Sequence, residues 1–119
     1  MDEKIFKERT KQFGINIIQM TEKLPVSRAN DILARQVIRS ATSIGANYRA
    51  ACRAKSLPDM LNKLKIVEEE ADETQYWLEI LQEISPQTQI LSLAKEVNEL
   101  IAMTVASIKT LRLKNNPKS

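Results

Sequence analysis

Apolar residues recur along most of the chain at the three- and four-residue spacing of helices that bury one face. The first segment shows this clearly, with apolar side chains at positions 6, 13, 17, 20 and 24. The steps between them are seven, four, three and four residues, so all five fall on one helical face. This pattern predicts a helix from about residue 2 to residue 24.

Three short serine–proline signals divide the rest of the chain into further helices. They are Leu-Pro-Val-Ser at 24–27, Ser-Leu-Pro-Asp at 56–59 and Ser-Pro at 85–86. Proline ends or begins a helix, and serine caps the next one. We therefore predict helices over about 28–55, from 57 to about 84, and from Pro86, as the first helical residue, to about 113. The basic residues 114–119 are expected to form a flexible tail.

Long helices with short connections must lie antiparallel to their neighbours in sequence. With 119 residues, two glycines and four prolines, the chain has the length of one domain and few places to turn. We predict an all-α fold, an antiparallel up-down four-helix bundle with short loops, that occupies residues 1–113 as a single domain.

The second predicted helix carries two opposite stripes. The apolar stripe, expected in the core, comprises Leu33, Val37, Ala41, Ile44, Tyr48 and Ala51. The other, which we call the arginine stripe, lies within an arc of about 80° on the far side. It consists of Arg28, Arg35, Arg39, Arg49 and Arg53. A solvated helix face usually mixes charges, whereas only Asp31 accompanies these arginines.

The arginine stripe has two open interpretations. Guanidinium groups pair well with phosphates and with carboxylates. Because the stripe points away from its own core, we expect it not to reach the acidic third helix of the same bundle, whose residues 57–84 hold eight acids and two lysines. It would then face nucleic-acid phosphates, acids of a neighbouring subunit, or solvent.

The third predicted helix has a second apolar stripe besides its core stripe. The core stripe comprises Met60, Leu64, Val67, Ala71, Thr74, Leu78 and Leu81. The second stripe comprises Ile66, Trp77, Ile80 and Ile84, on the far side of the helix. An exposed tryptophan within an apolar stripe is typical of a subunit contact, so we predict an oligomer interface here. The alternative is a wide core that wraps round this helix.

Gly45 and Asn47 are unusual residues for the middle of a helix. Glycine there is about 1 kcal/mol less favourable than alanine, which indicates that a neighbouring helix approaches closely at Gly45. Asn47 flanks the core stripe and is expected to be half-buried, with hydrogen-bond partners on an adjacent helix.

The composition argues against most catalytic chemistry. The chain has no histidine and a single cysteine, Cys52, so there is no Cys-His or Ser-His arrangement and no internal disulfide. The acidic run at 68–73 lacks the histidines of bundle di-iron sites, and we expect it to be solvated or ion-paired. No apolar run reaches bilayer length. We expect a cytoplasmic protein that is not an enzyme, with no metal, cofactor or membrane partner.

Three stretches resemble a known bacterial family. They are S-I-G-A-N-Y-R at 43–49, L-N-K-L-K-I-V-E-E-E-A-D-E-T at 61–74 and Y-W-L-E at 76–79. They are similar to the four-helix-bundle proteins encoded in 23S rRNA intervening sequences. A related protein is the accessory variability determinant of diversity-generating retroelements. The resemblance spans nearly the whole chain.

The resemblance implies an up-down bundle that assembles as a ring-shaped homopentamer, with a suspected role in binding structured RNA and no enzymatic activity. Together with the arginine stripe, it favours a non-enzymatic, oligomeric, nucleic-acid-associated protein whose five arginines hold phosphates. The alternative is a protein-interaction scaffold with no nucleic-acid role. In that case the arginine helix docks on the acidic helix of a neighbouring subunit.

Overall fold

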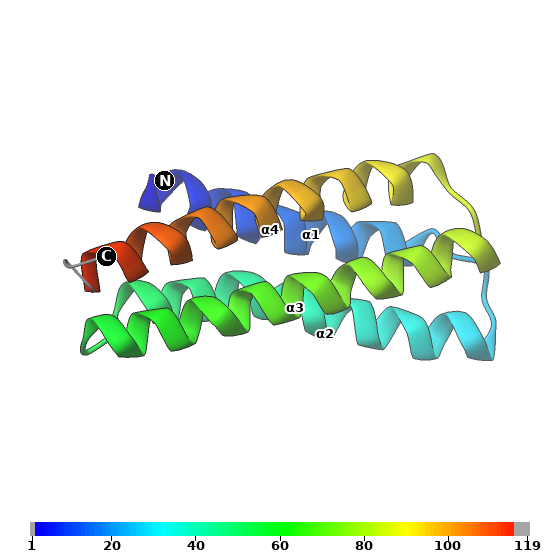
Figure 1. Ribbon diagram of the computed structural model, residues 1–119. Helices are drawn as coiled ribbons and strands as arrows, with labels where there is room; N and C mark the ends of the chain where they lie inside the picture. Colours follow the sequence, from blue (N-terminus) through cyan, green and yellow to red (C-terminus); the bar gives the residue numbers. More distant parts are fainter. Residues whose placement is uncertain (1, 116–119) are drawn as a thin grey trace.

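The computed structural model describes residues 2–115, which form four long helices. These helices are α1 (Glu3–Glu22), α2 (Arg28–Cys52), α3 (Leu57–Ile84) and α4 (Thr88–Asn115). They run alternately up and down, so both termini and the α2–α3 turn lie at one end of the bundle, and the other two connections lie at the opposite end (Figure 1). The all-α, four-helix architecture predicted from the apolar spacing is confirmed.

Side-chain caps fix where three of the helices begin. The hydroxyl of Ser27 accepts a hydrogen bond from the Asn30 backbone N–H at 3.0 Å, and the hydroxyl of Ser56 accepts one from the Asp59 N–H at 3.2 Å. Asp2 caps α1 in the same way through the Ile5 N–H. Each cap satisfies a backbone donor that has no partner inside the helix. Two of the three serine caps expected from the sequence, Ser27 and Ser56, are therefore present, whereas Ser85 lies at the C-terminal cap of α3.

The helix ends differ from the prediction by a few residues. The first helix ends at Glu22 and not at residue 24, because Pro25 disfavours a helical conformation for the residue before it. The second ends at Cys52 and not at 55, where the Arg53 N–H turns back to the Ala50 carbonyl at 3.2 Å. Such three-residue hydrogen bonds tighten and close the last turn.

The prediction for Pro86 is wrong. The fourth helix begins at Thr88, two residues later, because the Ser85 N–H still bonds to the Leu81 carbonyl of α3 at 2.7 Å. The chain then needs Pro86 and Gln87 to reverse direction. At its other end α4 includes residues 114 and 115, which the prediction assigned to the tail. The remaining tail residues, 116–119, lie outside the described part of the chain.

One apolar core runs the length of the bundle. The predicted core positions of α1 are all buried. Those of α2 and α3 are buried too, apart from Leu33 and Met60, which are half-buried and pack against the core. At the end of the bundle that carries both chain termini, the rings of Phe6 and Tyr48 meet edge to face with their centroids 4.5 Å apart, so α1 is joined to α2 by a buried aromatic pair.

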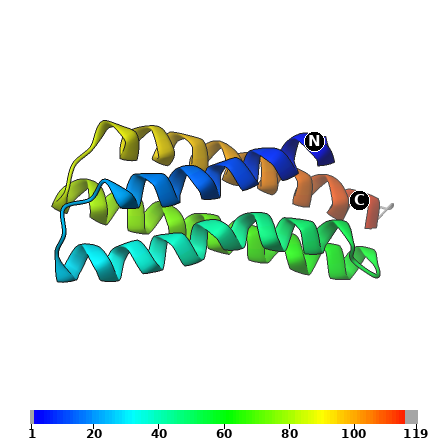
Figure 2. The same ribbon diagram turned by 180° about the vertical axis from the view of Figure 1, so that it is seen from behind.

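Helices α1 and α4 make the sparsest contact of the four neighbouring pairs. The view from behind shows them side by side along the bundle (Figure 2). Arg9 of α1 bridges them, with its Nε and Nη2 atoms each 2.7 Å from a carboxylate oxygen of Glu96 and Nη2 3.2 Å from Glu99. Hydrogen bonding to Glu96 raises the pKa of Arg9. A bidentate ion pair thus holds this open side of the bundle together.

Candidate nucleic-acid interface

The arginine stripe lies on the outer face of α2 and at its C-terminal cap. All five arginines of the stripe are exposed, as the helical wheel predicted. The stripe runs nearly the full length of the helix, from its first residue, Arg28, to its cap, Arg53. Because of this length, its two ends lie at opposite ends of the bundle.

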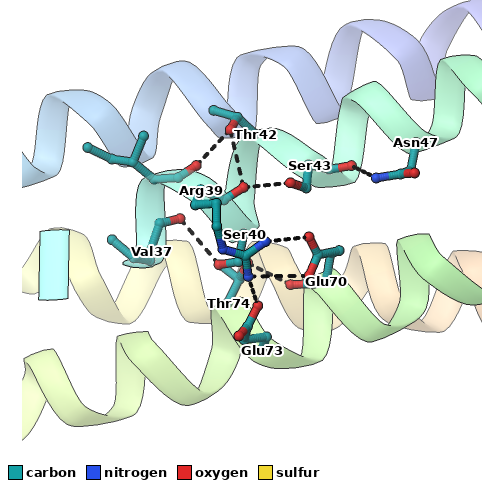
Figure 3. Close-up of polar contacts among 10 residues, drawn as sticks. Val37, Arg39, Ser40, Thr42, Ser43, Asn47, Glu70, Glu73 and Thr74 are labelled. Atoms are coloured by element: carbon teal, nitrogen blue, oxygen red, sulfur yellow. Dashed lines mark hydrogen bonds and ion pairs between the residues drawn. The ribbon is translucent and has the colours of Figure 1, made fainter. Parts of the chain in front are cut away.

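Arg39 pairs with the acidic third helix of its own bundle, so the expectation that the stripe does not reach those acids is wrong at this position. Its Nη1 atom lies 3.0 Å from a carboxylate oxygen of Glu70, and its Nη2 atom contacts Glu73 (Figure 3). Hydrogen bonding to Glu70 raises the pKa of the Arg39 guanidinium. The long side chain crosses the edge of the tightly packed α2–α3 interface, which a single-helix wheel does not represent.

The other four arginines of the stripe make no ion pair within residues 2–115. Two acids of α3, Glu70 and Glu73, are already engaged by Arg39, and a third, Glu68, pairs with Lys65 of its own helix at 3.3 Å. These four guanidinium groups are therefore available to an anion outside the subunit.

Gly45 lies where α1 approaches α2, as predicted. A Cβ atom placed on Gly45 would be 3.2 Å from the Oγ1 atom of Thr10 and 3.6 Å from the Thr10 backbone carbon. The absence of a side chain at residue 45 therefore allows the two helices to pack at this distance.

Asn47 is half-buried as expected, but its hydrogen bond stays within α2. Its Nδ2 atom donates to the Ser43 carbonyl at 2.9 Å, whereas a partner on an adjacent helix was predicted (Figure 3). The polar link between helices comes instead from Thr74 of α3, whose hydroxyl donates to the Ser40 hydroxyl at 2.8 Å in the buried core. The Asn47 side-chain amide can donate to a carbonyl in the preceding turn of its own helix, and the spacing of residues in the sequence does not exclude this bond.

The second apolar stripe of α3 is divided between the core and the surface. Trp77 is half-buried and packs against the core of its own subunit, so it does not lie on a face wholly separate from that core. Ile80 is also half-buried. Ile66 and Ile84 are 38% and 53% exposed, which leaves these two as the accessible apolar members of the stripe.

Two lysines lie beside the arginine stripe but belong to α1, so a helical wheel of α2 alone does not contain them. Lys7 and Lys11 of α1 line the same groove as Arg49, a hollow of about 320 Å³ between α1 and α2. Their signal in the sequence is the 4, 7, 11 spacing of lysines on the first helix. In the described residues, no cluster of three or more acidic, cysteine or histidine side chains has the arrangement of a metal site. No helix in residues 2–115 is long and apolar enough to cross a membrane.

Comparison with known proteins identifies the family of this chain. The model of the family described as 23S rRNA-intervening sequence protein matches residues 2–106. The chain belongs to this family. The crystal structure of a protein with unknown function from the S23 ribosomal protein family of Bacteroides thetaiotaomicron is similar, with 34% sequence identity and a TM-score of 0.83. The match covers 92% of this chain and 99% of that one. No curated protein matches the chain.

The structural match covers nearly the full length of both chains, so the bundle described above is the fold that this member of the 23S rRNA-intervening sequence family shares with its neighbour. The family match ends at residue 106. The last turns of α4, with Lys109, Arg112 and Lys114, therefore lie beyond the matched segment.

Proposed function

We propose that this protein is a non-enzymatic, oligomeric, cytoplasmic protein that binds structured RNA through exposed guanidinium groups on α2. The observation that supports this most is that four arginines of the stripe, Arg28, Arg35, Arg49 and Arg53, are exposed with no ion pair in residues 2–115. The proposal includes the homopentameric assembly and the relation to the accessory variability determinant that the family resemblance implies.

Such a surface recognises phosphates and not bases. Guanidinium groups bind phosphate oxygens with directed hydrogen bonds, and contacts of this kind position a protein on nucleic acid with little sequence readout. Stacking on single-stranded bases needs exposed aromatic rings. Here both phenylalanines and Tyr48 are buried, and Tyr76 is the one exposed aromatic residue in residues 2–115. One exposed ring makes no platform for successive bases, so a structured, phosphate-rich RNA is the better match.

Wild-type protein is expected to bind a structured RNA hairpin with an affinity that falls linearly in a plot of log affinity against log salt. Replacing Arg28, Arg35, Arg49 and Arg53 by Gln should weaken binding. On a duplex the same change should flatten the slope by about 0.9 for each phosphate that the protein no longer neutralises. Fluorescence anisotropy at several salt concentrations measures both quantities. A wild-type protein that binds no RNA at low salt would contradict the proposal.

The scaffold function remains a second candidate because Ile66 and Ile84 are exposed beside the acids of α3. If this surface joins subunits, replacing both residues by Glu should dissociate the oligomer while the chain stays helical. Light scattering and circular dichroism test the two outcomes. Val26→Glu is a matched control, since Val26 is 98% exposed in the α1–α2 connection. A wild-type monomer at micromolar concentration would exclude this interface.

A further inference from the structure

Charge is separated along the length of the bundle. We define the terminal end as the last three turns of each helix on the side that carries both chain termini, together with the turn between α2 and α3, that is, residues 2–13, 42–67 and 105–115 (Figures 1 and 2). It holds twelve cationic and four acidic side chains. The rest of the described chain holds five cationic and eleven acidic side chains. The up-down topology produces this separation, because it brings together segments that are far apart in the sequence.

Most of the cations at the terminal end have no partner within the subunit. Four of the twelve form ion pairs: Lys7 with Glu3, Arg9 with Glu96 and Glu99, Lys63 with Asp59, and Lys65 with Glu68. The other eight are exposed and make no ion pair within residues 2–115. They are Lys4, Lys11, Arg49, Arg53, Lys55, Lys109, Arg112 and Lys114.

The acids at the terminal end are almost all occupied. Glu3 and Asp59 pair with lysines four residues on, and Asp59 also accepts from the Lys55 backbone N–H. Asp2 caps α1. Glu8 is the one carboxylate of this end with neither an ion pair nor a hydrogen bond inside the described chain. Eight free cations therefore face solvent with one free carboxylate among them.

The free cations come from different helices and surround the same end. Lys11 of α1 and Arg49 of α2 line one groove between those helices. Lys114 of α4 lines a cavity of about 510 Å³ together with Tyr48 of α2 and Met60 of α3. The bundle spans 22 Å in both short directions, so the eight charges surround a segment of that width and about 16 Å of helix length. A DNA duplex carries about one negative charge per 1.7 Å of its axis, so a duplex crossing this width presents more phosphates than there are free cations.

We propose that the terminal end, and not the arginine stripe as a whole, is the surface that holds the phosphate backbone of RNA. This inference rests on the proposed RNA-binding function and locates it. Arg49 and Arg53 belong to the terminal end, Arg39 is engaged by its own subunit, and Arg28 and Arg35 lie near the acid-rich opposite end. Summed charge of one sign over a face steers a polyanion towards it.

The acidic surface of a second copy of the chain is a poorer partner for this end. Of the eight exposed acids that make no ion pair within residues 2–115, half lie in one line along the side of α3, at Glu69, Asp72, Glu79 and Glu83. Acids in a single line on one helix cannot pair with cations that surround the end of a bundle. The phosphates of a nucleic acid lie along a curved path and can contact cations on several helices.

Two variants with the same change in net charge test the inference. The end variant carries Lys11→Gln and Lys109→Gln. The control variant carries Lys23→Gln and Lys95→Gln, which likewise change one exposed lysine of α1 or its cap and one of α4 but lie outside the terminal end. None of these four lysines forms an ion pair in the described chain, so both variants should fold and melt like wild type. Binding of a labelled RNA hairpin is measured by anisotropy from about 50 to 200 mM salt, where affinity depends strongly on the number of phosphates that the protein neutralises.

The end variant is expected to bind about tenfold or more weakly at about 100 mM salt, with a flatter salt slope, whereas the control variant stays within about twofold of wild type. Equal weakening in both variants would overturn the inference and leave RNA binding standing as an effect of net charge. Greater weakening in the control variant would place the site at the opposite end of the bundle. An end variant that no longer self-associates but keeps its RNA affinity would assign the end to a subunit contact. Wild-type protein that binds no RNA would overturn the proposed function as well.

Discussion

Phe6→Ala is expected to lower the free energy of unfolding by about 3–5 kcal/mol. The Phe6 side chain is fully buried, and its ring meets that of Tyr48 edge to face, with 4.5 Å between the ring centroids. Truncation removes this ring pair and leaves a cavity between α1 and α2 that the surrounding helices fill only in part. Because α1 makes its sparsest contact with α4, it packs mainly on α2, and the Phe6–Tyr48 pair is part of that contact.

Urea denaturation followed by far-ultraviolet circular dichroism measures this destabilisation. Ile5→Ala is the matched control, because Ile5 is the adjacent residue of the same helix but 60% exposed, and surface substitutions usually change stability by no more than about 0.5 kcal/mol. Similar stabilities for the two variants would mean that α1 does not dock on α2 through Phe6 in solution.

Gly45→Leu is expected to destabilise the fold by about 1–3 kcal/mol. The first side-chain atom would already lie 3.2 Å from the Thr10 hydroxyl oxygen, and the next atoms would extend into the backbone of α1. The hydroxyl cannot move aside freely, since it donates to the Phe6 carbonyl at 2.9 Å and lies 3.1 Å from the Lys7 carbonyl. The two helices must therefore separate to admit a leucine.

Gly14→Ala provides the contrast to Gly45→Leu. A Cβ atom on Gly14 would lie 3.5 Å from a methyl carbon of Thr42, which is an ordinary packing distance. This substitution should stabilise the protein by about 0.4–1 kcal/mol, because alanine restricts the unfolded chain. Thermal melts of the two variants should shift in opposite directions. A Gly45→Leu protein that melts at or above the wild-type temperature would show that α1 and α2 are further apart than described.

The fold was predictable because local signals and the apolar period agree. The spacing of Phe6, Phe13 and Ile17 defines one face of α1, and Ser27 and Ser56 cap the helices that follow the breaks. The start of α4 was not predictable from the proline alone. The first residue of α4 depends on how many residues the chain needs to reverse direction after the last backbone hydrogen bond of α3.

The candidate site was predictable only in part, because a helical wheel treats each helix as isolated. It placed the arginines correctly on the outside of α2. It could not show that Arg39 crosses to Glu70, which depends on how closely α2 and α3 pack. Nor could it show that Lys11 lies beside Arg49, or that the cations of α4 lie at the same end as both. These neighbours are created by topology, between residues tens of positions apart.

The order of the helices also bears on how quickly the chain folds. Each well-packed pair, α1 with α2, α2 with α3 and α3 with α4, is adjacent in the sequence and joined by a short connection. Only the sparse contact of α1 with α4, bridged by Arg9, closes a loop of most of the chain. Bundles dominated by such local pairings fold within microseconds to milliseconds, because little loop-closure entropy is spent before packing begins. We therefore expect α1 to close against α4 late, after the other three pairs have formed.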